Sequence, residues 1–476
     1  MSANFRRDFS FFGILGASLF VLFLLNQTPR TDAIPAFARK YQTACSTCHN
    51  NYPELNDFGE AFKKNGFKFP KDDETFVKEA PVMLGAKAQK EAFPKAVYPG
   101  EIPGTIPIGF RYSGFATINS KQPIDLGFVP RSDLFTPNTF TVIAAGSFGP
   151  NMSFWIDDDI STGGSGADGG LGDGYLKFND LGHYLGLPKD ALNVRFGQFE
   201  LDLPFTQART INLSDYDIFD QTSNIGSLPG STMNPLTLGA PQRGIEIGGY
   251  PNDGNFEWSA TILNGNNDGT AVRNSKDVYF RVSQRFNLDR DAASRKEIRA
   301  SGPTGPHDHT SVRFGAFYYY GRNALNLDQT AFPGFGTINE PFYRAGADFR
   351  FKYQKFELYA LGMHARDNNL FPNPATTTLD RAAPVTYSGG FAEAEYWIYP
   401  WVIGLMRYDV VNSPTDFLNG ASEHNTRSRF SPGIQFLIRD NIKAAFEYSY
   451  RWQQPDPNTS EFFRANGFTA GIDYVF

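Results

Sequence analysis

Residues 442–451 read Ile-Lys-Ala-Ala-Phe-Glu-Tyr-Ser-Tyr-Arg, and this stretch decides the fold. Apolar side chains occupy every second position up to Tyr450, whereas Lys443, Glu447 and Arg451 lie between them. A period of two marks a β-strand that has one apolar and one polar face. Such a strand suits a sheet with lipid on one side and water on the other.

The same alternation recurs from residue 107 to the C-terminal Phe476. Counting these runs predicts about sixteen strands of roughly ten residues, within the range of bacterial barrels. Tight turns, such as residues 148–151 and 251–254, alternate with long connections, as short periplasmic turns and long outer loops require. One exception is the long segment 288–310, which lies on the short-turn side. The aromatic C-terminus resembles the assembly signal of bacterial outer-membrane barrels. We predict an all-β fold, a transmembrane antiparallel β-barrel over residues 107–476. The alternative is a soluble sandwich or solenoid.

The composition agrees with a barrel. The 476 residues include 44 Lys and Arg against 50 Asp and Glu, for a net charge of −6. This mild acidity argues against a nucleic-acid-binding protein, which would show a basic stripe. The mean hydropathy of −0.37 is too polar for a bundle of membrane helices. In a barrel, however, each lipid-facing residue is matched by a polar lumen-facing one.

The N-terminus has the pattern of a secretory signal peptide, which we place at residues 1–33. Arg6 and Arg7 precede an apolar run over residues 11–25, and small residues such as Ala33 follow. The alternative is a permanent membrane anchor. The apolar run is shorter than the ~20 residues that a spanning helix needs, which favours cleavage. We therefore expect an exported protein.

The only two cysteines lie just beyond this signal, in the run Cys45-Ser-Thr-Cys48-His49. Two thiols two residues apart, followed by histidine, form the attachment pattern of a c-type haem. Each thiol adds to one vinyl group of the porphyrin, and the adjacent imidazole becomes the proximal iron ligand. The alternatives are a structural disulfide and a thioredoxin-like redox pair, but nothing nearby resembles the βαβ unit of the latter.

A short helix follows the motif and suits a haem cradle. Pro53 and Glu54 fit its first turn, Lys63 and Lys64 its last turn, and Gly66 the position beyond. Leu55, Phe58 and Phe62 would form its apolar face. We place a monohaem cytochrome c segment at residues 34–75 and a linker at 76–106. One short helix cannot enclose a macrocycle, so we expect the barrel to supply the rest of the pocket.

Other residues are candidates for supporting roles. Met83 is the nearest methionine and could be the distal ligand of the haem iron, since a thioether would raise its potential. A lone methionine more often serves packing. The remaining histidines are scattered and are interpreted as loop or surface residues: His183, His307, His309, His364 and His424.

Two sets of charged residues could act in the lumen or its outer loops. Carboxylates attract hard cations such as Fe(II), and we place these in outer loops: Asp157, Asp158, Asp159, Asp168, Asp173, Asp215, Asp217 and Asp220. The favoured alternative is that they are solvated loop carboxylates without a bound ion. The longest loop, residues 202–241, could fold inward and narrow the pore. Five arginines are expected to face the lumen, where they could pair with haem propionates or form salt bridges: Arg281, Arg285, Arg344, Arg350 and Arg451.

The N-terminal part of the chain resembles the fused monohaem cytochrome–porins found in the outer membrane of iron-oxidising bacteria. The resemblance is carried by residues 34–39, the Cys45–His49 motif and the stretches 53–62 and 65–67. The resemblance is specific over residues 34–70 and architectural over the barrel. It implies one covalent haem c inside the barrel, which accepts electrons from extracellular Fe(II). Periplasmic carriers, c-type cytochromes or cupredoxins, would receive them. By position, Cys45 and Cys48 are the thioether sites and His49 the proximal ligand.

Two other functions remain open at this point. Electrons could run outward to external acceptors, or the chain could be a transport porin with a structural or sensory haem. The redox potential separates the two directions of electron flow, and solute flux through the protein would favour transport. A hydrolytic enzyme is disfavoured, because no nucleophile elbow or metal-ligand helix motif occurs.

Overall fold

The computed structural model describes most of the chain from Ala36 onward. The described residues are 36–70, 73–78, 82–83, 87–92, 101–102, 107–119, 132–148, 151–160, 170–206, 209–221, 236, 238–265, 275–288, 310–326, 337–373, 378–412, 427–452 and 466–476. The chain divides into two units, Met1–Ile34 and Pro35–Phe476. The predicted signal peptide, residues 1–33, lies outside the described residues, because these begin at Ala36.

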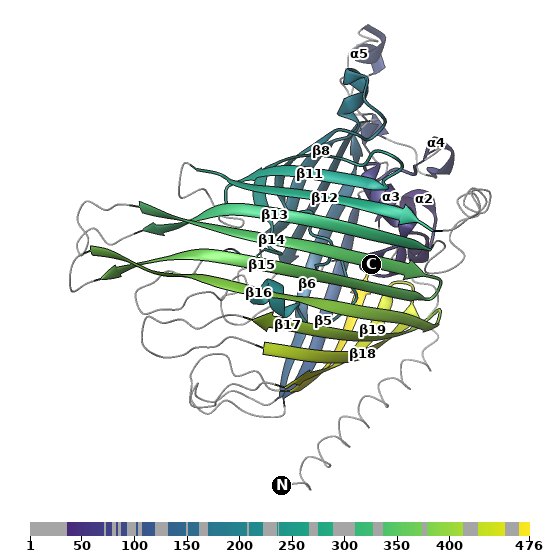
Figure 1. Ribbon diagram of the computed structural model, residues 1–476. Helices are drawn as coiled ribbons and strands as arrows, with labels where there is room; N and C mark the ends of the chain where they lie inside the picture. Colours follow the sequence, from purple (N-terminus) through teal and green to yellow (C-terminus); the bar gives the residue numbers. More distant parts are fainter. Residues whose placement is uncertain are drawn as a thin grey trace. The chain divides into compact units, whose positions relative to one another are not determined.

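Within these ranges, sixteen antiparallel strands form a closed barrel (Figure 1). Each strand pairs with its neighbour in sequence, and β20 pairs with β5 to close the ring. The strands are β5 (Ile108–Asn119), β6 (Ser132–Phe148), β7 (Met152–Ile160), β8 (Gly170–Phe178), β9 (Asn193–Phe199), β10 (Gln242–Gly249), β11 (Phe256–Leu263), β12 (Asp277–Asn287), β13 (Ser311–Asn326), β14 (Thr337–Tyr353), β15 (Phe356–Asn373), β16 (Thr378–Tyr399), β17 (Val402–Asn412), β18 (Arg427–Arg439), β19 (Ile442–Arg451) and β20 (Gly467–Val475). The predicted fold class is confirmed.

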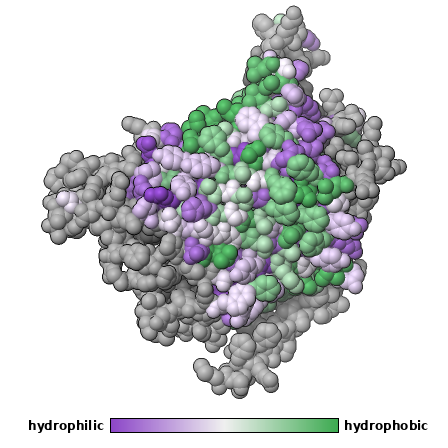
Figure 2. Space-filling view, viewed as in Figure 1, coloured by the Kyte–Doolittle hydropathy of each residue, from purple (hydrophilic) through white to green (hydrophobic). Residues whose placement is uncertain are grey.

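The period-two pattern separates a lipid face from a polar lumen. On β19, Phe446 and Tyr448 are exposed on the outside, whereas Lys443 and Glu447 are buried inside. Figure 2 shows hydrophobic residues spread across the strand face that it presents. Among the described residues, no helix is both long and apolar enough to cross a bilayer. An apolar outer surface around a closed ring of paired strands is the arrangement of a transmembrane barrel of the outer-membrane type.

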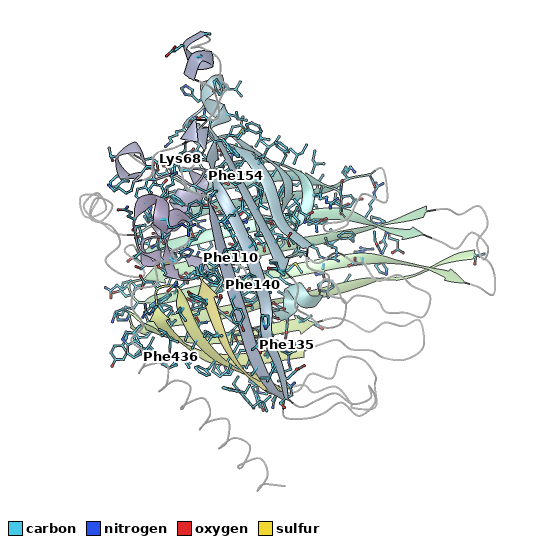
Figure 3. The ribbon with its side chains drawn as sticks, turned by 180° about the vertical axis from the view of Figure 1, so that it is seen from behind. Lys68, Phe110, Phe135, Phe140, Phe154 and Phe436 are labelled. Atoms are coloured by element: carbon cyan, nitrogen blue, oxygen red, sulfur yellow. The ribbon has the colours of Figure 1, made fainter. Side chains whose placement is uncertain are left out.

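The C-terminus completes the closure of the barrel. The backbone amide of Phe476 donates to the Phe110 carbonyl at 2.8 Å, beyond the last paired residues of β20 and β5. The ring of Phe476 stacks on that of Phe110, with centroids 5.4 Å apart, and also meets Phe140. Figure 3 shows Phe110 and Phe140 side by side on β5 and β6. The terminal aromatic residue therefore belongs to the outer aromatic surface at the seam.

The connection between β9 and β10, residues 200–241, folds into the lumen, and we call it the inner loop. Leu201, Leu203 and Ile211 on this loop are fully buried. Its helix α6 (Asp217–Gln221) contacts β16 and β17. The predicted inward fold of this loop is confirmed. Residues 207–208, 222–235 and 237 of the loop lie outside the described residues.

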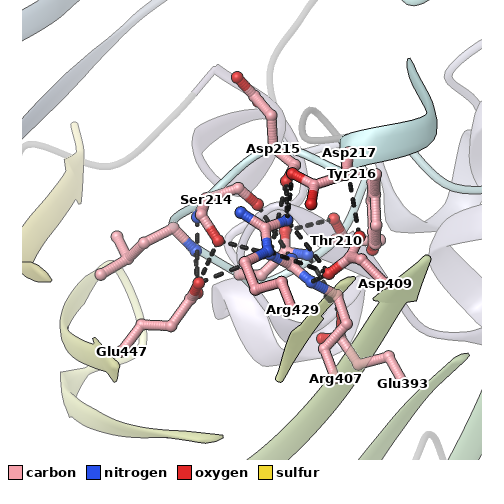
Figure 4. A network of polar contacts seen from close by, with 12 residues as sticks. Thr210, Ser214, Asp215, Tyr216, Asp217, Glu393, Arg407, Asp409, Arg429 and Glu447 are labelled. Carbon is pink, nitrogen blue, oxygen red and sulfur yellow. Dashed lines mark hydrogen bonds and ion pairs between the residues drawn. The ribbon is translucent and has the colours of Figure 1, made fainter. Parts of the chain in front are cut away.

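A network of charged residues holds the inner loop against the wall (Figure 4). Arg407 donates to Asp409 at 2.8 Å and to the Ser214 carbonyl at 2.9 Å. Asp217 on the loop forms ion pairs with Arg451 at 2.9 Å and Arg429 at 3.4 Å. These groups are buried, so each charge needs its partner to offset the cost of desolvation. The loop is therefore fixed inside the barrel by specific pairs.

A second insert, residues 36–70, also lies in the lumen, and we call it the plug. It contains α2 (Ala36–Tyr41), the short 3-10 helix η1 (Cys45–Thr47), the two-stranded hairpin of β1 (His49–Asn51) and β2 (Glu54–Leu55), and α3 (Asp57–Lys64). The described parts of the following segment are α4 (Asp73–Phe76), β3 (Val82–Met83), α5 (Lys87–Ala92) and β4 (Glu101–Ile102).

The predicted start of the cradle helix at Pro53 is wrong. Pro53 and Glu54 belong to the hairpin, and the helix begins after Asn56, whose side chain accepts a hydrogen bond from the Gly59 amide at 2.8 Å. Asparagine is among the best residues for this capping role, which explains the later start. The helix end at Lys64 is as predicted, and Gly66 adopts a φ of 70° just beyond it.

Candidate cofactor site in the barrel lumen

Arg350 on β14 is the main anchor of the plug. Its guanidinium contacts Glu54 at 2.9 Å and Glu60 at 3.2 Å, and it also hydrogen bonds to Glu357 on β15. Burial, followed by the charge of Glu357, raises the pKa of Glu54 to about 8. Three carboxylates thus compete for one arginine at this contact between plug and wall.

Further contacts tie the plug to strands around the barrel. Asp57 lies 3.5 Å from Arg285 and 3.4 Å from Lys352, and Lys64 pairs with Glu257. The Asn51 side-chain amide donates to Gln435 at 2.7 Å, and Lys443 donates to the Tyr52 carbonyl at 2.6 Å. Most of these partners lie near strand ends that are joined by short turns, and Arg285 lies at the same end of the barrel, where the longer connection 288–310 joins β12 to β13. The plug therefore occupies the short-turn end of the lumen, the periplasmic end in such barrels.

The Cys45–His49 motif crosses this plug. Cys45 and Cys48 are free thiols in and just after η1, so the structure does not form the alternative disulfide. The Ser46 hydroxyl donates to Asp440 at 3.0 Å, in the short turn between β18 and β19. The motif thus reaches the turn at the end of the barrel while both thiols and His49 line the lumen cavity.

Asn56 and Gly59 hold α3 against the motif. The Asn56 side chain donates to the carbonyls of Ser46 and Thr47 at 3.2 and 3.1 Å, and its backbone amide donates to the Cys48 carbonyl at 3.0 Å. A Cβ atom at Gly59 would lie 2.0 Å from that same carbonyl oxygen. Only glycine permits this approach. Neither residue was singled out from the sequence, although an asparagine before a helix and a glycine inside one are readable signals.

An aromatic cluster packs beside the motif. Tyr41, Phe62 and Phe67 of the plug are buried together with Ala145 of β6, and Trp155 of β7 packs against them. The Tyr41 hydroxyl donates to Asp73 at 2.7 Å. The predicted apolar face is confirmed for Phe62, but Leu55 belongs to the hairpin. This cluster gives the cavity an apolar wall.

The cavity between the plug and the inner loop has a volume of about 920 Å³. Cofactor sites span roughly 300–1,000 Å³ and are mostly apolar with a few placed polar groups. The wall includes the motif and the aromatic cluster on one side, and Asp215, Tyr216 and Phe219 of the inner loop on the other. The barrel supplies strand residues between them, such as Arg111 and Thr141. As expected, residues of the barrel strands form part of the wall of this pocket.

The donor set fits a covalently bound haem. Burial raises the pKa of Cys45 to about 11 and that of Cys48 to about 12. Burial also lowers the pKa of His49 to about 4, so its imidazole is neutral and can act as a ligand at neutral pH. Among the described residues, the buried Nδ1 of His49 has no hydrogen-bond partner. Two thiols and a neutral imidazole thus face one cavity of suitable size.

The other candidate ligands are dispersed. Met83 lies in β3, which pairs with β4, but its side chain lies outside the described residues, so its role as distal ligand stays a prediction. His183 lies in η2 (Leu181–Leu185) and His364 is exposed on β15, which agrees with surface positions. His307, His309 and His424 lie outside the described residues.

The assignment of Asp157, Asp158, Asp159 and Asp173 to an outer loop is wrong, because they lie on β7 and β8. Three successive aspartates and nearby glycines are typical of a loop, yet β7 pairs with β6 through Asp157, Asp158 and Asp159. Asp157, Asp159 and Asp173 line the cavity. Asp217 is paired with arginines rather than solvated, and Asp168 lies outside the described residues.

The five lumen arginines all form salt bridges with carboxylates. Their ion pairs include Arg281–Asp348 at 2.6 Å, Arg285–Asp57 at 3.5 Å, Arg344–Asp367 at 2.8 Å, Arg350–Glu54 at 2.9 Å and Arg451–Asp217 at 2.9 Å. The interpretation as lumen salt bridges is confirmed. Two of the five, Arg285 and Arg350, hold the plug.

Comparison with known proteins gives structural neighbours only. No family model matches the chain, and no curated protein matches its sequence. Among solved structures, OmpF of Salmonella typhi shares 13% identity with a TM-score of 0.46, covering 78% of this chain and 97% of its own. The outer membrane channel DcaP of Acinetobacter baumannii shares 14% identity with a TM-score of 0.44, covering 78% and 96%. These similarities concern the fold alone.

Proposed function

We propose that this chain is an outer-membrane cytochrome–porin that takes electrons from extracellular Fe(II) through a single c-type haem and passes them to periplasmic carriers. The observation that carries the proposal is the position of the Cys45–His49 motif. It lines a cavity within the lumen of a transmembrane barrel, between the plug and the inner loop. A single redox centre in this position lies between the two sides of the membrane.

Each residue of the motif has a defined role in this proposal. Cys45 and Cys48 would hold the porphyrin by thioether bonds, and His49 would be the proximal iron ligand. Haem, when bound, supplies a carrier for one electron. Asn56 holds the motif carbonyls in place, and Gly59 lets α3 pack directly on Cys48. The aromatic cluster excludes water from one side of the cavity.

Carboxylates in the cavity wall suit an approaching ferrous ion. Asp157, Asp159, Asp173 and Asp215 line it, and carboxylate oxygens attract hard divalent cations. At the opposite end, Ser46 contacts Asp440 in a short turn. A periplasmic carrier that docks on these turns would therefore come close to the motif. This arrangement supports electron flow from outside to inside.

The transport alternative is less well supported by the geometry. The plug is fixed to β8, β11, β12, β14, β18 and β19 by hydrogen bonds and ion pairs. The inner loop occupies a second level of the same lumen. A solute pathway would have to pass both inserts. Outward electron transfer remains compatible with the geometry, and the redox potential decides between the two directions.

The proposal is tested by mixing the purified oxidised protein with Fe(II) in a stopped-flow spectrometer. We expect the haem absorption to change to that of the reduced form in wild type. The Cys45→Ala/Cys48→Ala variant should lack covalently bound haem and show no such change. Wild-type protein that is purified without bound haem, or whose haem stays oxidised in excess Fe(II), would contradict the proposal.

A further inference from the structure

Three buried carboxylates converge where the plug meets the barrel wall. Glu54 of β2, Glu357 of β15 and Glu395 of β16 each place an oxygen within 4.8 Å of the other two. Their exposed fractions are 4%, 0% and 1%. Glu357 and Glu395 are directly opposite each other on neighbouring strands. Like charges in this position destabilise a sheet, so the arrangement requires positive charge nearby.

The neighbouring cation does not balance this negative charge. Arg350 contacts Glu54 and Glu357, but it is also shared with Glu60. Among the described residues, the only hydrogen bond to Glu395 comes from the Tyr359 hydroxyl, at 3.1 Å. Lys352 attracts Glu54 and Lys443 attracts Glu395, but these two lysines form their ion pairs with Asp57 and Asp473. Among the directly paired groups, three ionised carboxylates against one arginine leave an excess of two negative charges. A buried excess of this size is costly unless a counter-charge is present.

Two of the carboxylate oxygens have no protein donor. Within the described residues, neither Oε2 of Glu54 nor Oε2 of Glu395 has a hydrogen-bond partner, although both atoms are buried. Both residues also line the lumen cavity, which gives an ion and its waters a path of entry. Oxygen ligands lie about 2.3–2.6 Å from Ca²⁺, so two of them on one ion can be up to about 5 Å apart. The observed spacing is compatible with a shared ion.

We infer that Glu54, Glu357 and Glu395 form a divalent-cation site that joins the plug to the barrel wall. The set offers oxygen ligands alone, which favours Ca²⁺, Mg²⁺ or Mn²⁺ over metals that prefer thiolate or imidazole. One divalent cation offsets the two excess charges. The bound cation would link the hairpin that begins at His49 to β15 and β16. The inference does not depend on the haem or on the electron donor.

The site is tested with Mn²⁺ as the probe, in full-length protein that has been treated with a chelator and dialysed. Electron paramagnetic resonance of free Mn²⁺ measures binding. We expect wild type to bind Mn²⁺ at one site, and Glu395→Gln and Glu54→Gln to bind it at least about tenfold more weakly, because each loses a charged ligand. Asp158→Asn is the matched control, since Asp158 is exposed on β7. It should bind as wild type does.

Thermal unfolding separates a cation site from a purely structural cluster. Without metal, Glu395→Gln should unfold at a higher temperature than wild type, because one of two opposed charges is gone. Added Mn²⁺ should raise the unfolding temperature of wild type but not that of Glu395→Gln. No saturable Mn²⁺ binding in wild type, or equal binding in Glu395→Gln, would overturn the inference and show that the carboxyls share protons instead.

Discussion

At the residue scale, Gly59 controls how closely α3 approaches the Cys45–His49 motif. Alanine normally stabilises a helix interior by about 1 kcal/mol relative to glycine. Here the added Cβ would lie 2.0 Å from the Cys48 carbonyl oxygen, which is backbone and cannot rotate away. We expect Gly59→Ala to displace the motif and lower the haem content per protein several-fold. Absorption spectra of the purified protein, normalised to protein concentration, measure this ratio.

A second glycine provides the control for this substitution. A Cβ at Gly404 on β17 would meet only Ile398 at 3.6 Å, an ordinary contact. Gly404→Ala should therefore bind haem as wild type does. If Gly59→Ala also retains the full haem content, close packing between α3 and the motif is not required for attachment.

Asn56 acts on the same contact through hydrogen bonds. Its side chain caps α3 and donates to two carbonyls of the motif. Loss of an asparagine cap costs about 0.5–2 kcal/mol, so Asn56→Ala should increase hydrogen exchange of the α3 amides by roughly tenfold. Asn56→Asp keeps the capping oxygen but loses the two donors, and should show a smaller increase. Equal exchange in all three proteins would argue against the cap.

At the element scale, the plug presents acidic residues to a basic wall. Arg350 is the point at which most of these contacts meet, because it reaches both β2 and α3. The Arg350 side chain is partly exposed, but its partners Glu54 and Glu357 are buried, so removing the arginine leaves their charges desolvated and unpaired. We expect Arg350→Met to loosen the plug while the barrel stays folded. Limited proteolysis should then cleave within residues 36–70 faster than in wild type.

Arg322 offers a matched arginine for this experiment, because it is exposed on β13. Arg322→Met should leave the proteolysis rate of the plug unchanged. If Arg350→Met also leaves it unchanged, the remaining contacts of the plug, such as Asn51 with Gln435, carry its attachment.

The elements differ in how far the sequence predicts them. Strand positions follow from a local period of two, as on β19, where lipid and lumen faces were assigned residue by residue. The start of α3 was misplaced because Pro53 satisfies the same local rule as a true helix start. The pairing of Arg350 with Glu54 joins residues 296 apart in sequence. Only the folded barrel brings such residues together, so the anchor of the plug could not be read from local patterns.

At the scale of the whole molecule, two inserts occupy successive levels of one lumen. The plug lies at the short-turn end, and the inner loop lies beyond it, held by Arg407 and Asp217. The Cys45–His49 motif is predicted to attach haem from five residues, because the pattern depends on their order alone. The sequence alone does not show that the motif lies in the lumen, or that carboxylates of β7 and β8 line the same cavity. Both follow only from the three-dimensional structure.

The two inserts predict a low permeability. A barrel of sixteen strands normally leaves a water-filled channel, but here charged contacts fix the plug on several sides. We expect single-channel conductance in planar bilayers to be low for wild type and about tenfold higher for a variant that lacks residues 36–70, since the lumen is then narrowed by the inner loop alone.

Arg350→Met tests the same prediction without a deletion. A loosened plug should produce intermediate conductance with frequent transitions, whereas Arg322→Met should behave as wild type. High, steady conductance in wild type would mean that solutes pass both inserts freely. The chain would then act as a transport porin, and the haem motif would serve a structural or sensory role, because the ion pairs of the plug would not close the lumen to solutes.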